Sequence, residues 1–151
     1  MDNGQLIIDN FGMDNFGRGN CQLSTLNYQL GVFSMNRKPN IVRDKSFAFA
    51  LQIIKVVQYL QDEKREYILS KQLMRSGTAI GALIREAEQA QSRPDFIHKM
   101  NIALKEANET DYWIDLLFQS QLMPQDRYDT LHPDIQELLR LLISIVKSSK
   151  S

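Results

Sequence analysis

The sequence predicts an all-α protein: an antiparallel up-and-down four-helix bundle that follows a poorly ordered N-terminal tail. Apolar and small residues recur at alternating steps of four and three through residues 93–120, the heptad pattern of a helix packed against partner helices. Three other segments have helical periodicity, and the short connections between them favour an antiparallel bundle. Glycine and asparagine, by contrast, concentrate before residue 35. We therefore divide the chain into a tail, residues 1–34, and a four-helix bundle domain, residues 35–151.

The tail is predicted from its turn-forming composition. Five of the seven glycines lie before residue 35, together with five asparagines, and such sequence favours turns and resists helix. The apolar side chains of this segment have two interpretations. They are incidental content of a loosely ordered extension, or they form a segment that docks on a partner.

The first predicted helix covers residues 44–60 and the second covers residues 65–91, with a polar break at residues 62–65. Both are predicted from apolar residues at helical spacing, which define one inward face on each helix. The inward positions expected in the first helix are Phe47, Ala50, Leu51, Ile54, Val57 and Leu60. Those expected in the second helix are Ile68, Leu69, Leu73, Ile80, Ile84 and Ala87.

Two glycines lie four residues apart inside the second predicted helix. Glycine in a helix needs a packing reason, because it lowers helix stability relative to alanine. Gly77 and Gly81 are therefore predicted to let another helix approach closely, with Ser76 and Ala79 extending the surface of small residues. The alternative, a phosphate-binding loop, fits poorly because the pair is in the middle of a helix.

The third predicted helix covers residues 93–120 and has a clear N-terminal signal. Ser92 is suited to cap it, and Pro94 and Asp95 are suited to its first turn, where a missing N–H and a negative charge are both acceptable. The heptad seam that faces the other helices consists of Phe96, Met100, Ala103, Ala107, Thr110, Ile114 and Leu117.

A second apolar line runs beside that seam. It consists of Ile97, Leu104, Trp113 and Phe118. A helix in a monomeric bundle usually needs only one apolar face, so the additional line predicts an interface with another copy of the chain. A wide face directed into the core of one bundle is the alternative interpretation.

The fourth predicted helix covers residues 133–148. Pro124 ends the third helix, residues 124–132 are read as a loop or a short helix, and Pro133 is expected to open the fourth. Residues 148–151 are expected to fray. The inward positions are Ile135, Leu138, Leu139, Leu142, Ile145 and Val146.

Composition limits the classes of function. Eighteen basic and eighteen acidic side chains cancel, so net charge gives no argument for a nucleic acid or an anionic membrane. Cys21 is the only cysteine, which rules out an intrachain disulfide framework and a cysteine-rich zinc site. No basic run precedes an apolar core at the start, and no stretch is apolar for about 18 residues. We expect a cytoplasmic protein without a membrane association.

Charge is nevertheless distributed unevenly. Residues 64–105 hold eight basic and four acidic side chains, whereas residues 106–137 hold one basic and eight acidic. When the second and third helices fold about their turn, basic residues gather at one end of the bundle. The candidate nucleic-acid contacts are Arg85, Arg93, Lys99 and Lys105. An ordinary solvated surface is the alternative interpretation.

The sequence shows no catalytic or cofactor motif. A ferritin-like di-metal centre needs two Glu-x-x-His motifs, but Glu86 is followed three residues later by glutamine and Glu106 by another glutamate. His98 and His132 lie on different predicted segments and are interpreted as surface or packing residues. Glycine-rich nucleotide loops are absent. We expect no enzyme, no metal and no cofactor.

Three runs carry a family resemblance: SGTAIGALIREA at residues 76–87, AQSRPDFIHKM at 90–100 and ALKEANETDYW at 103–113. Together with LHP at 131–133 and ELLRLL at 137–142, they resemble the bacterial four helix bundle proteins, also called 23S rRNA-intervening-sequence proteins. These are similar to the accessory variability proteins of diversity-generating retroelements. The resemblance covers about residues 40–147.

The resemblance implies an antiparallel four-helix bundle that assembles as a ring of five subunits, and no established enzyme activity. In the retroelement relatives it implies a basic surface that contacts nucleic acid and the reverse transcriptase. Those relatives are strongly basic, whereas this chain is neutral. Leu83 stands where the family often has asparagine, and Ala79 where it often has serine, which suggests a dry contact at Leu83.

Two functional hypotheses follow. One is a homo-oligomer that binds RNA or DNA through the basic end of the bundle. The other is a protein-interaction scaffold or accessory subunit that assembles through the additional apolar line and has no affinity for nucleic acid. Salt-dependent binding of nucleic acid distinguishes them.

Overall fold

The computed structural model describes residues 39–150, so the predictions for the tail, including Cys21, lie outside the described residues. Four α-helices follow one another: α2 (Ile41–Asp62), α3 (Leu69–Ala87), α4 (Arg93–Gln119) and α5 (Gln125–Lys150). No strand occurs within residues 39–150. The predicted all-α four-helix fold is confirmed.

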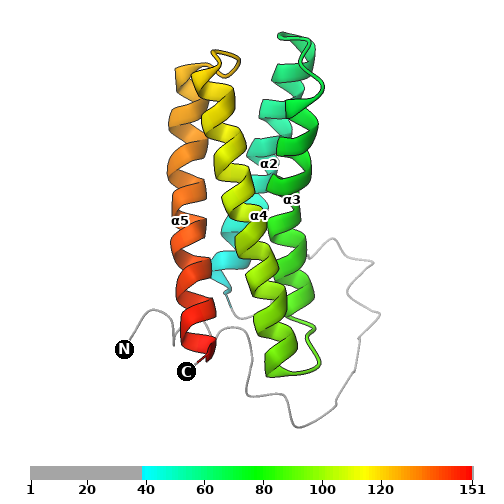
Figure 1. Ribbon diagram of the computed structural model, residues 1–151, viewed down its shortest axis with the longest axis vertical. Helices are drawn as coiled ribbons and strands as arrows, with labels where there is room; N and C mark the ends of the chain where they lie inside the picture. The colour runs from blue at the N-terminus through cyan, green and yellow to red at the C-terminus, as the bar shows by residue number, and fades with distance from the viewer. Residues whose placement is uncertain (1–38, 151) are drawn as a thin grey trace, which may run out of the picture.

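The helices form a closed bundle in which each one packs against two others. α2 contacts α3, α3 contacts α4, α4 contacts α5, and α5 returns to α2. Consecutive helices run in opposite directions, so the α2–α3 and α4–α5 connections lie at one end and the α3–α4 connection at the other (Figure 1). Short connections produce this arrangement because they force each helix to return along its predecessor.

The predicted inward faces of the third and fourth helices are confirmed. All seven seam residues of α4 and all six predicted positions of α5 are buried. They meet buried aliphatic and aromatic side chains of α2 and α3 in one continuous core. This core explains why the heptad pattern is so regular in α4, which lies between α3 and α5.

The predicted face of the first helix is only partly confirmed: Val57 and Leu60 are buried as predicted, whereas the positions of Phe47 and Leu51 are wrong. Phe47 and Leu51 are 52% and 47% exposed, while Phe49 and Ile53 are almost completely buried. The buried stripe consists of Val42, Ser46, Phe49, Ile53, Val56, Val57 and Leu60. α2 has two apolar lines with helical spacing, and periodicity alone could not decide which one faces the core.

α2 begins earlier than predicted because Asn40 caps it. The Asn40 side chain accepts a hydrogen bond from the backbone N–H of Arg43, at 3.3 Å. Its amide also donates to Glu88 at the end of α3, at 3.0 Å. Asn40 is buried, and it therefore ties the first turn of α2 to the last turn of α3.

α3 begins at Leu69 rather than at residue 65. The Glu66 carboxylate accepts hydrogen bonds from three backbone N–H groups at the helix start, those of residues 68, 69 and 70, at 2.7–3.0 Å. Arg65, with φ of 54°, turns the chain just before this cap. Ile68 lies outside the helix and is 76% exposed, so its predicted inward position is wrong. The helix ends at Ala87, short of the predicted residue 91.

α4 begins as predicted, with the Ser92 hydroxyl accepting a hydrogen bond from the Asp95 N–H at 3.3 Å. α5 does not begin at Pro133. It begins at Gln125, where the Pro124 carbonyl accepts hydrogen bonds from the N–H groups of Arg127 and Tyr128. Pro133 lies inside the helix on its exposed side, where water can satisfy the carbonyl that lacks an N–H partner. Residues 148–150 are helical rather than frayed.

α2 and α3 approach closely at the two glycines. A Cβ atom at Gly77 would lie 2.8 Å from Ile53 Cγ1, and one at Gly81 would lie 3.4 Å from Ser46 Oγ. Ile53 and Ser46 are both fully buried, so the missing side chains are what allows this spacing. None of the described helices has the length and hydropathy needed to cross a bilayer.

Candidate functional site

The predicted basic end lies where α3 turns into α4, at the same end of the bundle as the end of α5 (Figure 1). A shallow, open depression is present there. It is lined by Ala82, Arg85, Glu86, Gln89, Gln91, Asp95 and Lys99. Two of the four predicted cations therefore line the depression, but two carboxylates line it as well.

Lys99 is paired within the bundle. Its Nζ donates to Glu86 Oε2 at 2.8 Å, which joins α4 to the last turn of α3. The hydrogen bond to Glu86 and the negative charge of Glu86 raise the pKa of Lys99. A phosphate group that binds Lys99 would have to compete with this carboxylate.

Arg93 and Arg85 also have partners within the chain. Arg93 Nε donates to the backbone carbonyl of Ser149 at 3.0 Å, so it satisfies an acceptor at the C-terminal end of α5. The guanidinium of Arg85 lies over the ring of Phe47, 5.3 Å from its centroid. Both arginines are nevertheless exposed to solvent.

Lys105 lies further along α4, outside the depression, and is exposed. It makes no ion pair with any residue from 39 to 150. The four predicted cations are thus brought to the same half of the bundle but do not converge on one point. Lys99 is the one of the four that pairs with a carboxylate and Arg93 is engaged by a carbonyl, so Arg85 and Lys105 are the two without either partner among residues 39–150.

Arg43 is a further basic residue at this end that the sequence did not single out. Its Nη1 lies 3.3 Å from Glu88 Oε1, and both side chains are largely shielded from solvent. Glu88 also accepts the Asn40 amide, so the three residues connect the start of α2 to the end of α3. The sequence does show a possible capping asparagine, Asn40, three residues before Arg43. It does not show that Glu88, 45 residues after Arg43, is the partner of this arginine.

The additional apolar line of α4 lies at the edge of the core. Ile97, Leu104 and Trp113 are half-buried and pack against the core. Phe118 stacks on Tyr128 of α5, with ring centroids 4.0 Å apart. These contacts lie within one bundle and leave part of each side chain accessible.

An aromatic pair lies on the outer surface of α4. Tyr112 is 58% exposed and lies edge-to-face against Trp113, with centroids 5.0 Å apart. The indole N–H of Trp113 donates to Glu109 Oε1 on the same helix, at 3.2 Å. Because the indole N–H of Trp113 already has an acceptor, the part of this side chain that remains accessible beside Tyr112 is mainly apolar.

A third group of residues lies between α4 and α5, near their connection. Asp111, Asp115 and His132 each place one possible metal-ligand atom within 4.8 Å of the others. Burial raises the pKa of Asp111, and the charge of Asp115 acts in the same direction. The sequence analysis missed this group because it placed residue 132 in a loop or short helix ahead of the fourth helix.

Comparison with known proteins identifies the family. The family model described as 23S rRNA-intervening sequence protein matches residues 38–144. A solved structure of a protein of unknown function from the S23 ribosomal protein family of Bacteroides thetaiotaomicron VPI-5482 is 54% identical. The match covers 70% of this chain and 98% of the chain in the solved structure, with a TM-score of 0.69. Among curated proteins, none matches the chain.

Proposed function

The chain belongs to the 23S rRNA-intervening sequence protein family, and from this premise we propose that it is a non-enzymatic bundle that assembles with copies of itself and associates with nucleic acid through its basic end. The family description, which names ribosomal RNA, supports the second part of this proposal. The single observation that carries the first part is the exposed Tyr112 on α4, which lies edge-to-face against the half-buried Trp113.

Self-association is supported by where apolar area remains uncovered. Tyr112 is more than half exposed although it lies beside a half-buried tryptophan on a helix that already has a complete buried seam. Tyrosine and tryptophan are enriched at protein interfaces because they combine large contact area with few rotatable bonds. The candidate interface is therefore the outer face of α4 around Tyr112 and Trp113, whereas Ile97 and Leu104 lie on the other flank of the buried seam.

Light scattering coupled to size exclusion tests this interface. The parent chain is expected to elute as an oligomer of defined mass, and Tyr112→Glu is expected to shift it to the monomer, because an exposed charge would be desolvated in the interface. Tyr67→Glu is the matched control, since Tyr67 is 53% exposed on the α2–α3 connection. A monomeric parent chain, or equal behaviour of the two variants, would contradict the proposal.

Nucleic-acid association is supported by two of the predicted cations, Arg85 and Lys105, which have neither a carboxylate nor a carbonyl partner among residues 39–150. Arg85 lines the depression between α3 and α4, and Lys105 extends from an exposed position of α4. Phosphate contacts by such side chains give affinity that falls with salt, with a slope of about 0.7 per contact for single strands.

Fluorescence anisotropy with a labelled RNA across a salt series tests this part. The double variant Arg85→Glu with Lys105→Glu is expected to lower affinity at least tenfold and to reduce the salt slope by roughly 1.4, the contribution of two contacts. Lys71→Glu is the control for the charge change, because Lys71 is exposed near the opposite end of α3. Retained affinity in the double variant would refute the assignment of the binding surface.

The alternative function, a scaffold for another protein without affinity for nucleic acid, also has a specific observation in its favour. Lys99 is paired with Glu86, and Arg93 is engaged with the Ser149 carbonyl. Much of the positive charge at the basic end is therefore used inside the bundle. A stable oligomer that binds neither RNA nor DNA at physiological salt would select this alternative.

A further inference from the structure

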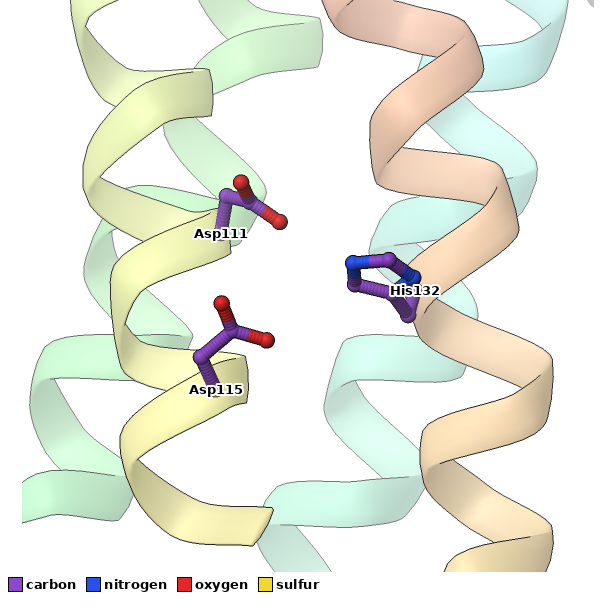
Figure 2. Close-up of side chains that lie close together, drawn as sticks. All are labelled: Asp111, Asp115 and His132. Atoms are coloured by element: carbon purple, nitrogen blue, oxygen red, sulfur yellow. The ribbon is translucent and has the colours of Figure 1, made fainter. Parts of the chain in front are cut away.

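Three side chains with metal-ligating atoms converge at the end of the bundle opposite the α3–α4 turn. Asp111 and Asp115 are one helical turn apart on α4, and His132 projects toward them from α5 (Figure 2). One ligand atom from each residue lies within 4.8 Å of the other two. The group therefore bridges two helices and combines oxygen and nitrogen donors.

Side chains of α5 hold each of the three in place. Gln136 Nε2 donates to Asp111 Oδ1 at 2.9 Å, and the Tyr128 hydroxyl donates to Asp115 Oδ1 at 3.0 Å. The ring of Tyr128 also stacks on the imidazole of His132, with centroids 4.9 Å apart. Such supporting contacts are typical around metal ligands, where they fix orientation and leave the second carboxylate oxygen available.

No lysine or arginine of the described residues offsets the negative charge of the two aspartates at this point. Neither Asp111 nor Asp115 forms an ion pair with a lysine or arginine among residues 39–150. Asp111 is half-buried and lies within reach of a second carboxylate, that of Asp115. A bound divalent cation would neutralise the pair.

We propose that Asp111, Asp115 and His132 form a binding site for a divalent transition-metal ion, with Zn²⁺ as the ion that the donor set fits best. Imidazole is a ligand for zinc and its neighbours, whereas Mg²⁺ and Ca²⁺ prefer oxygen alone. Bonds of about 2.0–2.2 Å place two ligands of one ion at most about 4.4 Å apart. The three donor atoms lie within 4.8 Å of one another, so they must draw slightly closer to share one ion.

The site supplies three protein ligands and leaves at least one coordination position for water or an outside donor. Because the ligands come from α4 and α5, the ion joins these helices close to their connection. Metal that binds the folded chain and not the unfolded one stabilises the bundle by mass action. A rise in melting temperature with zinc is therefore expected.

Isothermal titration calorimetry with ZnCl2 on the untagged, EDTA-treated full chain tests the site. The Cys21→Ser background removes the only cysteine, so that thiol binding does not contribute. The variants are His132→Gln, Asp111→Asn and Asp115→Asn. His98→Gln is the matched control, because it removes the only other histidine, an exposed residue near the start of α4.

We expect one zinc ion per chain, at least tenfold weaker binding in each of the three site variants, and an unchanged affinity in His98→Gln. Zinc is expected to raise the melting temperature of the background chain but not that of Asp115→Asn. Asp115 is exposed, so this variant keeps the fold and decides the question even if His132→Gln unfolds. Absence of saturable zinc binding in the background chain, or equal affinity in Asp115→Asn and His98→Gln, would overturn the proposal.

Discussion

At the scale of single residues, a few polar side chains determine where the helices begin. Glu66 is the clearest case, because one carboxylate serves three backbone N–H groups at the start of α3. Burial alone would raise the pKa of Glu66, but the N–H donors of Leu69, Ser70 and Ile68 outweigh it and hold the pKa below its usual value. The charged form is therefore the one that the folded state stabilises.

Glu66→Gln is expected to lower the free energy of unfolding by about 0.5–2 kcal/mol at pH 7, the usual range for loss of a helix cap. Because the folded pKa lies below the unfolded value, the stabilisation is complete above about pH 4.3 and is lost as the pH falls through the folded pKa. Urea denaturation of both proteins between pH 3 and 7 measures this difference. A difference that persists unchanged at pH 3 would contradict the role of the charge.

Substitution by alanine is expected to have opposite effects on stability at the two glycines of α3. Gly77→Ala would place its Cβ 2.8 Å from the buried Ile53, and such overpacking typically costs about 1–3 kcal/mol. Gly81→Ala meets Ser46 Oγ at 3.4 Å, close to ordinary contact, so the helix propensity of alanine should stabilise it by up to about 1 kcal/mol. Denaturation midpoints that move in the same direction in both variants would refute the close approach at Gly77.

At the scale of elements, the sequence analysis was most successful where one apolar line dominates a helix. The seam of α4 and the inward face of α5 followed from local periodicity. In α2, two apolar lines compete, and the choice of Phe49 and Ile53 over Phe47 and Leu51 depends on the neighbouring helices. The early start of α5 was missed because Pro133 resembles a helix opener, although the helix contains it on an exposed side.

Pro133 should therefore weaken α5 relative to alanine. Pro133→Ala restores the missing backbone donor within the helix and is expected to raise the free energy of unfolding by about 1 kcal/mol. This gain is smaller than the ~3 kcal/mol by which proline destabilises the interior of a model helix relative to alanine, because the backbone of α5 already accommodates the ring. Pro124→Ala, at the start of the same helix, is the control and should give no gain. Chemical denaturation compares the two, and a loss of stability in Pro133→Ala would show that the proline is needed at that position.

At the scale of the whole molecule, one core extends through all four helices, so the bundle should unfold in a single step. Leu138→Ala, in the buried face of α5, is expected to lower the free energy of unfolding by about 2–5 kcal/mol. The loss should appear at the same denaturant concentration in far-UV circular dichroism and in the fluorescence of Trp113 on α4. Separate transitions would show that α4 and α5 unfold independently.

The limits of sequence reasoning were set by contacts between helices. The four-helix fold was predictable because each helix carries its own periodic pattern. The convergence of Asp111 and Asp115 on His132 was not, because it requires the alignment of α4 with α5. The same holds at the basic end, where the pairing of Lys99 with Glu86 and of Arg93 with Ser149 emerged only from the packed bundle.

The alternating direction of the four helices has a practical consequence: the order in which they are joined along the chain can be changed. An even number of antiparallel passes brings the start of α2 and the finish of α5 to the same end of the molecule (Figure 1). A circular permutant in which a short glycine-serine linker joins residue 150 to residue 39, with new termini cut into the exposed 63–65 stretch, should retain every helix and the core between them.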